Sequence, residues 1–383
     1  MTHETDVLVV GGSAAGLATA ACLRPTGVRV EVLEASDYVG AAWRAHYDRL
    51  HLHTPRSASS LPGVPMPRSW PRYPSRAQVV QYLEHYADFQ RVLPRFGVTV
   101  ARVERDGDGW RTSTSEGEWR SRHVVLATGA TRVPVRPTWP GMDEFHGDVL
   151  HSGEYRNGEP WRGRSVLVVG FGNSACEQAL DLVEHGVATH MSVRSAVNVI
   201  PRDMLGVPVL QLGIAMRHLP TGLADALAAP LVRLSVGDVR DVGLRRLPYG
   251  PNTQIARDRH IPLLDIGTMA LIREGRIVVH PGIARFTPTG VVMVDGSTLD
   301  VDAVVLATGY RPGLEDLLPD WRAVCDDDGR PRVSGGPTAL PGLWFVGQFV
   351  APSGMLREIG REARRVAAAI ATDARASSGQ ASG

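Results

Sequence analysis

Short apolar runs that end at glycine-rich turns alternate with helical patterns along this chain, and they predict buried parallel strands. Val166–Val169 is one such run, mostly β-branched, and the turn Gly170–Ala175 follows it at once. Apolar residues then recur with helical spacing to about Gly186. A buried strand, a tight glycine turn and a helix in this order are typical of a dinucleotide-binding fold.

The same pattern stands at the N-terminus. Asp6–Val10 is a predicted buried strand, Gly11–Gly16 is its glycine turn, and Leu17–Leu23 begins a helix. The next predicted strand, Val28–Leu33, ends on Glu34. The sequence therefore predicts an α/β protein with two Rossmann-like dinucleotide-binding domains.

Two near-identical segments, each a strand that runs into Ala-Thr-Gly, indicate how these domains are connected. His123–Ala127 leads into Thr128-Gly129, and Ala303–Ala307 leads into Thr308-Gly309. We interpret them as the places where the chain leaves one nucleotide fold and later returns to it. One domain is then inserted into the other.

The domain bounds follow from this interpretation. They are 1–155 for the first part of the outer domain, 156–300 for the inserted domain with a helical insertion around 204–260, 301–371 for the second part of the outer domain, and 372–383 for a disordered tail rich in Ser, Gly and Ala. Other predicted elements are helices at 76–89 and 355–370, a small antiparallel sheet of 98–103, 110–115 and 118–120, and strands at 189–193, 277–280, 291–294 and 343–346.

The two turns differ in the residue that ends their second strand, and this difference predicts two different nucleotides. Glu34 suits a free ribose 2′-hydroxyl, such as that of FAD. The strand Thr189–Val193 ends instead on Arg194-Ser195, a charged fork beside a hydroxyl, which suits the 2′-phosphate of NADPH. We therefore predict FAD in the outer domain and NADPH in the inserted one, with electrons passing between them.

Small residues in the turns have separate purposes. Gly170 allows the turn geometry, Gly172 lets the backbone approach a pyrophosphate, and Ala175 lets helix and strand pack closely. The phosphates would lie at the positive end of the helix. In the first turn, Ser13 replaces the middle glycine, and its Cβ narrows the approach. Its spacing differs from that of a hydrolase nucleophile elbow.

Composition excludes several classes of protein. Lys+Arg is 41 and Asp+Glu is 40, so the charge balance favours neither nucleic acid nor an anionic membrane as partner. The chain has no lysine, which excludes Schiff-base chemistry and a P-loop. Cys22, Cys176 and Cys325 are far apart, so we expect no local redox dithiol and a reduced, cytoplasmic protein.

No membrane segment or metal site is predicted. The N-terminus lacks the basic region of a signal peptide, and the uncharged stretch 204–216 is shorter than the roughly 20 residues of a membrane helix. His51 and His53 would share one face of a strand, but no third ligand accompanies them. The oligomeric state is left open.

A spaced pattern just before the strand Val166–Val169 indicates a family. Phe145-x-Gly147-x-x-x-His151-x-x-x-Tyr155 resembles the signature of flavin-containing monooxygenases, with this spacing in this place. The similarity extends over most of the chain and is strongest to the plant YUCCA-type enzymes, even across 204–267, where other members differ. The matching segments are 47–53, 73–75, 172–174, 193–195, 201–206, 262–267 and 307–310.

This resemblance implies an FAD- and NADPH-dependent monooxygenase. In the family, NADPH reduces FAD, and reduced flavin reacts with O2 to give a C4a-(hydro)peroxyflavin that retained NADP shields. YUCCA-like enzymes act on indole-3-pyruvate by oxidative decarboxylation, so an aryl-pyruvate is the implied substrate. Alternatives are N- or S-oxygenation or Baeyer–Villiger oxidation of a small metabolite, an NADPH-dependent flavoprotein reductase, and a non-catalytic flavoprotein.

The resemblance also implies site residues, although the chemistry belongs to the flavin and no catalytic side chain is assigned. Trp43 and the loop Arg49–His53 are expected along the flavin. His151 is expected to brace the inter-domain turn by hydrogen bonds. Gln348 stands where disulfide reductases carry Asp. The predicted cofactor-binding residues are Gly11, Gly12, Ser13, Ala14, Ala15, Gly16, Glu34, Trp43, Arg49, Leu50, His53, Thr128, Gly129, Gly170, Phe171, Gly172, Asn173, Ser174, Ala175, Arg194, Ser195, Thr308, Gly309 and Gln348.

Overall fold

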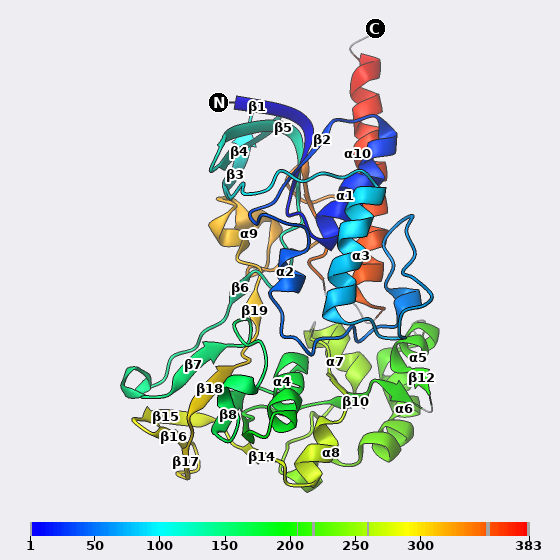
Figure 1. Ribbon diagram of the computed structural model, residues 1–383. Coiled ribbons are helices and arrows are strands. Elements are labelled where there is room, and N and C mark those ends of the chain that lie inside the picture. Colours follow the sequence, from blue (N-terminus) through cyan, green and yellow to red (C-terminus); the bar gives the residue numbers. More distant parts are fainter. Residues whose placement is uncertain (1, 205, 217–218, 259, 350–352, 381–383) are drawn as a thin grey trace. The chain divides into compact units, whose positions relative to one another are not determined.

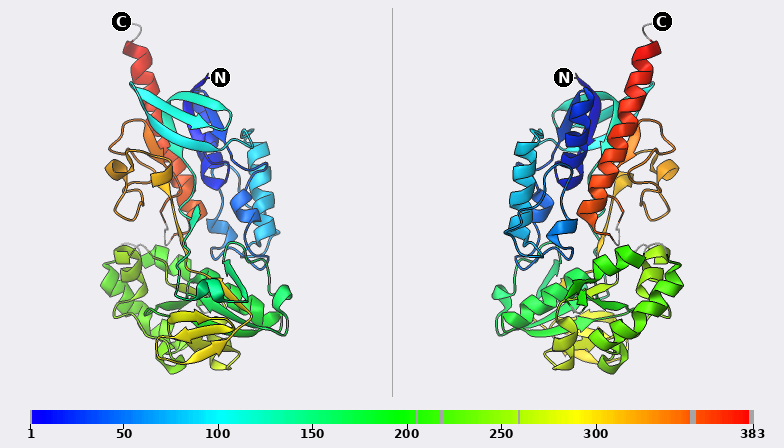
Figure 2. Two further views of the ribbon diagram at one scale, coloured as in Figure 1. Left: turned by 90° about the vertical axis from the view of Figure 1, so that its left-hand side faces the viewer. Right: turned by 90° about the vertical axis from the view of Figure 1, so that its right-hand side faces the viewer.

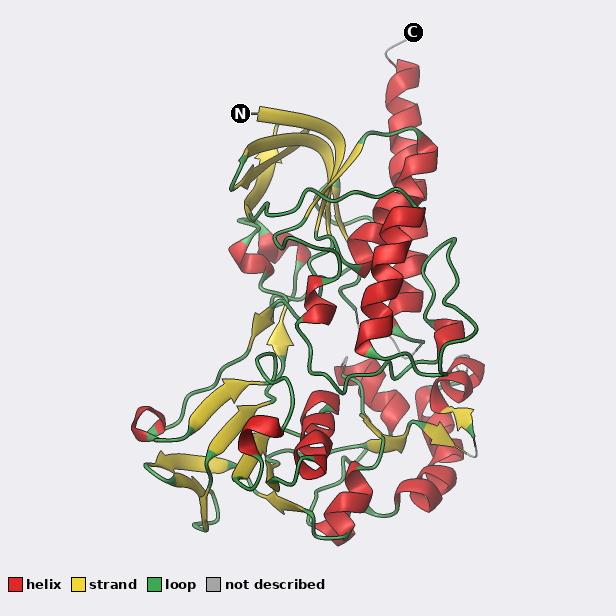
Figure 3. Cartoon of the chain, viewed as in Figure 1, coloured by secondary structure: helices red, strands yellow, loops and turns green. Residues whose placement is uncertain are grey.

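The computed structural model describes residues 2–204, 206–216, 219–258, 260–349 and 353–380. The fold is mixed α/β and divides into two compact units (Figures 1 and 3). The first unit comprises Met1–Arg44, Thr54–Val133 and Tyr310–Gly383, and the second comprises Ala45–His53 and Pro134–Gly309. The short strands β6 (Val133–Pro134) and β19 (Tyr310–Arg311) lie where the chain passes from one unit to the other.

The first unit is built on one mixed sheet. Its strands are β1 (Thr2–Val10), β2 (Val30–Leu33), β3 (Val100–Asp106), β4 (Gly109–Thr114), β5 (Gly117–Leu126) and β20 (Leu343–Phe345). Their order is β2-β1-β5-β4-β3, and β20 also pairs with β5. The pairs β1–β2, β1–β5 and β5–β20 are parallel, whereas β3, β4 and β5 form an antiparallel meander.

Helices complete the first unit. They are α1 (Ala14–Leu23), α2 (Ala41–Arg44), α3 (Arg76–Phe89), α9 (Trp321–Val324) and α10 (Met355–Gln380). The helices α1 and α10 pack along each other, as the blue and red ribbons of Figure 2 show. The predicted bounds of α3 are confirmed, because Ser75 and Gln78 form a capping box that fixes its start.

The second unit contains a fully parallel sheet of five strands. These are β7 (Asp148–His151), β8 (Ser165–Val169), β9 (Ala188–Ser192), β14 (Ile277–His280) and β18 (Ala303–Leu306), in the order β14-β9-β8-β18-β7. Such a sheet has two buried faces, which explains the apolar runs in its sequence.

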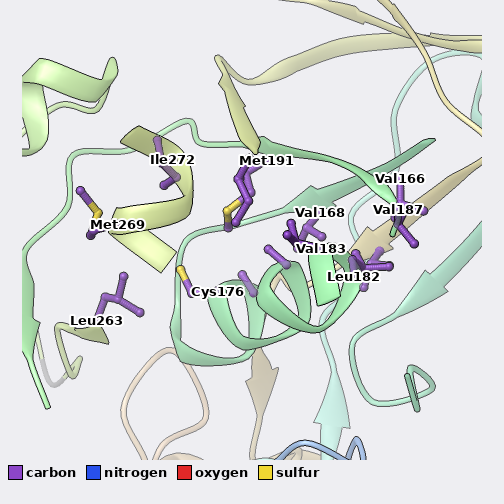
Figure 4. Close-up of a cluster of buried hydrophobic side chains, with 14 of the residues drawn as sticks. Val166, Val168, Cys176, Leu182, Val183, Val187, Met191, Leu263, Met269 and Ile272 are labelled. Atoms are coloured by element: carbon purple, nitrogen blue, oxygen red, sulfur yellow. The ribbon is translucent and has the colours of Figure 1, made fainter. Parts of the chain in front are cut away.

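Alternate residues of these strands enter two separate cores. Val166 and Val168 face α4 (Asn173–Glu184) and α8 (Thr268–Arg273) in the cluster of Figure 4. Leu167 and Val169 contact a small antiparallel sheet on the other face. That sheet consists of β15 (Ile283–Thr287), β16 (Gly290–Met293) and β17 (Thr298–Asp300).

The segment between β9 and α8 is partly helical, as predicted. It contains β10 (Val199–Pro201), β11 (Asp203–Met204), β12 (Val207–Pro208), α5 (Val209–Met216), α6 (Thr221–Val236), α7 (Pro251–Asp258) and β13 (Leu263–Asp265). The parallel pair β10–β13 brings the two ends of this segment together. There, Leu264 N donates a hydrogen bond of 2.9 Å to Asn173 Oδ1 at the start of α4.

The bounds of these units differ from the predicted domain bounds. The second unit begins at Pro134 and ends at Gly309, because β7 and β18 both pair within its sheet. The predicted assignment of 134–155 and 301–309 to the outer domain is therefore wrong at the level of these units. The segment Ala45–His53 also joins the second unit, where Tyr47 is buried in the core.

Two element predictions are also corrected. The predicted strands at 118–120 and 123–127 are one strand, β5, whose burial alternates at first and becomes continuous where β20 joins it. The predicted disordered tail is helical as far as Gln380. Alanine and arginine, which are strong helix formers, continue the pattern of α10 beyond Ile370.

Candidate functional site

The first glycine turn joins β1 to α1 and cannot accommodate larger side chains. Gly11 has φ +111°, and a Cβ there would lie 2.7 Å from the carbonyl oxygen of Ala127. A Cβ on Gly16 would lie 1.8 Å from Gly11 O. The turn is thus held tightly between its own helix and the end of β5, as a dinucleotide turn requires.

Glu34 lies directly against this turn. The backbone N–H of Gly12 donates to Glu34 Oε2 at 2.6 Å, and Ser36 donates through both its N–H and its hydroxyl to Oε1 at 2.9 Å. The carboxylate is therefore held at the end of β2 beside the glycines. Ser13 caps α1 without a side-chain hydrogen bond, so its hydroxyl is not used to cap the helix.

Two buried polar groups at the carboxyl edge of the same sheet have no hydrogen-bond partner within the described part of the chain. Thr128 Oγ1 follows β5, and the amide of Gln348, a residue only 5% exposed, follows β20. A Cβ on Gly347 would lie 3.0 Å from Ala15 Cβ, which places this turn beside the start of α1. Buried polar atoms are rarely left unpaired, so their position here indicates a bound polar ligand. Trp43, in α2, is half-buried.

The second glycine turn has the same construction in the second unit. Gly170 has φ +125°, and a Cβ there would lie 2.6 Å from Ala307 O, just as Gly11 meets Ala127. A Cβ on Gly172 would have no described atom within 4 Å, so this position faces open space. Ala175 is buried against the sheet. Gly170, Gly172 and Ala175 thus have the geometry of a dinucleotide turn, while nucleotide binding there stays a prediction.

A cluster of arginines follows β9. Arg194 and Ser195 are exposed, and Arg194 has no ion-pair partner among the described residues. Arg245 donates through its guanidinium to Arg194 O, and Val197 N donates to Arg245 O at 2.8 Å. The exposed Arg246 lies opposite Val197 in an isolated bridge. Arg245 and Arg246 were not predicted as coenzyme-site residues from the sequence. Two adjacent arginines were the only local signal that could have indicated an anion-binding site there.

The Thr308-Gly309 turn is occupied by internal hydrogen bonds. Thr308 Oγ1 donates to Val135 O at 2.5 Å, and His151 Nε2 lies 3.1 Å from Gly309 O. Gly153 N donates to His151 Nδ1 at 3.2 Å, so the imidazole donates through Nε2. Burial lowers the pKa of His151, in keeping with a neutral ring. His151 thus braces this turn, as expected.

The other signature residues are packed in the second unit. Tyr155 is fully buried, stacks on Trp161 at 5.8 Å, and donates to Asp181 Oδ2 at 2.6 Å. Phe145 packs edge-on against Phe286 at 5.6 Å. Both side chains make packing contacts or hydrogen bonds inside the unit. These two residues of the signature therefore stabilise the fold of the second unit.

Arg49, Leu50 and His53 belong to the second unit. Arg49 pairs with Glu184 and His53 Nε2 lies 2.6 Å from Glu177 Oε1, both glutamates being on α4. Leu50 packs against the core of the unit. The predicted contact of these residues with flavin stays a prediction.

Comparison with known proteins identifies the family. The model of the pyridine nucleotide-disulphide oxidoreductase family matches residues 8–203. The chain is 39% identical over 355 residues to the probable indole-3-pyruvate monooxygenase YUCCA3 of Arabidopsis thaliana, covering 89% of this chain and 81% of the relative. It is 41% identical over 337 residues to the indole-3-pyruvate monooxygenase YUCCA1 of Oryza sativa subsp. japonica, covering 87% and 83%. The chain belongs to the YUCCA family of flavin-containing monooxygenases.

The solved structures agree with membership of the YUCCA family. A flavin-containing monooxygenase from Stenotrophomonas maltophilia superposes with a TM-score of 0.73 at 26% identity, covering 97% of this chain and 99% of that chain. The protein is thus a flavin-dependent monooxygenase, and the prediction from the signature Phe145–Tyr155 is confirmed.

The cysteines of this YUCCA-family enzyme are not joined by a disulfide. Cys22, Cys176 and Cys325 are all free thiols. Burial raises the pKa of Cys22 and Cys176, and it raises that of Cys325 to about 11. Thiols of this kind are poor nucleophiles. Within the residues that the structure describes, none of the helices combines the length and the apolar character that crossing a membrane requires.

Proposed function

We propose that this monooxygenase converts an aryl-pyruvate, with indole-3-pyruvate as the representative substrate, into the corresponding aryl-acetate. The reaction consumes O2 and NADPH and releases CO2, NADP and water. The observation that carries this proposal is the identity of 39–41% to indole-3-pyruvate monooxygenases along most of the chain. FAD and NADPH are the cofactors, and O2 and the keto acid are the small-molecule partners.

FAD is assigned to the first unit. The Gly11–Gly16 turn would hold its pyrophosphate at the N-terminus of α1, and Glu34 would hold its ribose. The unpaired Thr128 Oγ1 and Gln348 amide fit a ligand rich in donors and acceptors. Bound FAD supplies the centre that accepts hydride and reacts with O2. Trp43 and Gly129 lie on the same unit and are proposed as further contacts.

NADPH is assigned to the second unit. Its pyrophosphate would lie at the open position beside Gly172, and its 2′-phosphate on Arg194 and Ser195. Arg245 adds a second guanidinium beside Arg194. No carboxylate pairs with Arg194 among the described residues, which favours an anionic ligand there. The proposed architecture is thus an NADPH-binding Rossmann domain inserted into an FAD-binding one.

The side chains of the enzyme would bind and orient the cofactors, while the oxygen chemistry stays with the flavin. Arginines fix the coenzyme by charge, and the buried His151 and Tyr155 keep the second unit rigid through hydrogen bonds. Three free thiols support a reducing compartment, and we propose the cytoplasm.

The test is product analysis with isotopic oxygen. Purified enzyme containing FAD is incubated with NADPH, indole-3-pyruvate and ¹⁸O2, and products are measured by mass spectrometry. We expect indole-3-acetate with a single ¹⁸O atom, CO2 in equal amount, and much slower turnover with NADH. Rapid NADPH oxidation that yields only hydrogen peroxide with every aryl-pyruvate would contradict the proposal. Oxygenation of an amine or sulfide instead would assign a different substrate class.

A further inference from the structure

The segment Ala45–His53 is attached to α4 by two side-chain pairs. Arg49 pairs with Glu184 and His53 with Glu177, and these glutamates are seven residues apart on one helical face. Tyr47 is buried in the core, and Asp48 N donates to Arg156 O at 2.9 Å. The backbone of the segment is thus fixed independently of the His53–Glu177 pair.

The two pairs differ in burial. The Arg49–Glu184 side chains are 25% and 53% exposed, typical of a surface tether. The His53 and Glu177 side chains are 19% and 3% exposed, and their Nε2 and Oε1 atoms are 2.6 Å apart. A buried carboxylate is costly without a partner, so Glu177 requires a hydrogen-bond donor. His53 is the donor that the structure provides.

This hydrogen bond determines what the other ring nitrogen can do. A carboxylate only accepts, so Nε2 of His53 donates to Glu177, and in the neutral ring Nδ1 then carries a lone pair. Nδ1 is buried and has no hydrogen-bond partner among the residues that the structure describes. An imidazole oriented by a carboxylate, with its second nitrogen free, is the arrangement of a general base. His151, which braces a turn, differs from His53 because both of its ring nitrogens are hydrogen-bonded.

The pair also lies next to the proposed coenzyme turn. Glu177 is one helical turn after Asn173, the first residue of α4, which directly follows Gly172. His53 is the last residue of its segment, and the chain enters the first unit at Thr54. The free Nδ1 thus belongs to the last residue of the second unit's segment before the chain returns to the first unit.

We propose that His53 and Glu177 form a proton-transfer pair for the oxygenation reaction, an inference that rests on the proposed function. His53 Nδ1 takes the proton of an O–H group of the substrate or cofactor, and that oxygen keeps the bonding electrons. Glu177 balances the positive charge of the ring and is a positioning residue. The same proton is returned when product forms, so the pair is unchanged after each turnover.

Matched variants separate proton transfer from tethering. His53→Gln keeps an N–H donor for Glu177 but lacks a basic nitrogen, and we expect kcat to fall about 100-fold with the KM for NADPH within about threefold of wild type. Glu177→Gln removes the charge and leaves an amide that can either accept from or donate to His53 Nε2, and we expect a loss of kcat of about tenfold. Glu184→Gln, on the same helical face, is the control and should match wild type. Imidazole added to His53→Ala should restore part of the rate.

A readout independent of turnover is the ¹⁵N spectrum of the histidine rings in the holoenzyme, with His53 assigned from the His53→Gln variant. We expect a single tautomer protonated on Nε2 in wild type and in Glu184→Gln, and loss of that preference in Glu177→Gln. Wild-type kcat in His53→Gln, or a mixture of tautomers in wild type, would overturn the proposal. If wild type fails to oxidise any aryl-pyruvate, the proposed function fails, and the tautomer result alone then decides on the pair.

Discussion

At the residue scale, two threonines in identical sequence segments have hydroxyl groups with different hydrogen bonding. Thr128 and Thr308 occupy the same place in two Ala-Thr-Gly segments that each follow a strand beside a glycine turn. Thr308 donates to Val135 O at 2.5 Å, whereas Thr128 Oγ1 is buried without a hydrogen-bond partner among the described residues. The hydroxyl of Thr308 stabilises the fold, and that of Thr128 is available to a ligand.

This asymmetry predicts opposite effects of one substitution. Thr308→Val leaves a carbonyl without its donor and should lower the free energy of unfolding of the apoprotein by about 1–2 kcal/mol. Thr128→Val removes an unpaired buried hydroxyl and should leave that free energy unchanged or raise it by about 1 kcal/mol, while weakening FAD binding. Urea unfolding of the apoprotein and FAD titration check both. Equal destabilisation in the two variants would show that Thr128 is paired in solution.

Residues of the proposed cofactor sites could be predicted where the chain itself sets the spacing. Gly11, Gly170, Glu34 and Arg194 each follow an apolar run, and the pattern alone therefore singles them out. Arg245 was not predicted to lie at this site. Its guanidinium donates to the backbone carbonyl oxygen of Arg194, which is 51 positions away in the sequence. No local period reports such a contact.

At the element scale, strands were predicted well where both faces are buried. The predicted Ile277–His280 is β14 itself, and Val166–Val169 is β8 but for one residue. The strand β18 was predicted to belong to the outer domain, but it pairs with β8 in the sheet of the second unit. An apolar run does not reveal which sheet the strand joins. The excursion Ala45–His53 was missed for a similar reason, since its attachment depends on single side chains such as Tyr47.

Adjacent parallel strands in the second unit carry an acid-sensitive pair. His190 on β9 and His280 on β14 lie with Nδ1 and Nε2 3.0 Å apart. Burial, and secondarily the neighbouring ring, lowers the pKa of His190 to about 4, and burial lowers that of His280. Between the ordinary histidine value of 6.5 and about 4, the unfolded chain binds a proton that the folded chain excludes.

The contribution of neutral His190 to the free energy of unfolding should therefore be fully present above about pH 6.5. It should be lost as the pH falls toward 4, which lowers the free energy of unfolding by about 3 kcal/mol. His190→Gln keeps a hydrogen-bonding side chain and removes the titration, so its acid loss should be smaller by this amount. Urea unfolding at several pH values measures the difference. The exposed His85→Gln on α3 is the control, and an unchanged acid limb in His190→Gln would contradict the assignment.

At the scale of the whole molecule, two units with separate cores each contain one glycine turn. The first core includes Leu8 and Val124 beside the Gly11 turn, and the second includes Val168 and Ala175 beside the Gly170 turn. Because each core is built from residues of its own unit, damage to one turn should remain local. The two cofactors should then be lost separately.

Gly11→Ala and Gly170→Ala test this independence. Each adds a Cβ within 2.7 Å of a carbonyl oxygen at a positive φ, so each should disrupt its own turn. We expect Gly11→Ala to purify without yellow flavin yet to be retained on a resin carrying 2′,5′-ADP, and Gly170→Ala to show the reverse. Gly27→Ala, with φ +84° but no atom within 4 Å of the new Cβ, should keep both properties because it adds strain without a clash. Loss of both ligands in either turn variant would mean that the two units fold as one cooperative structure.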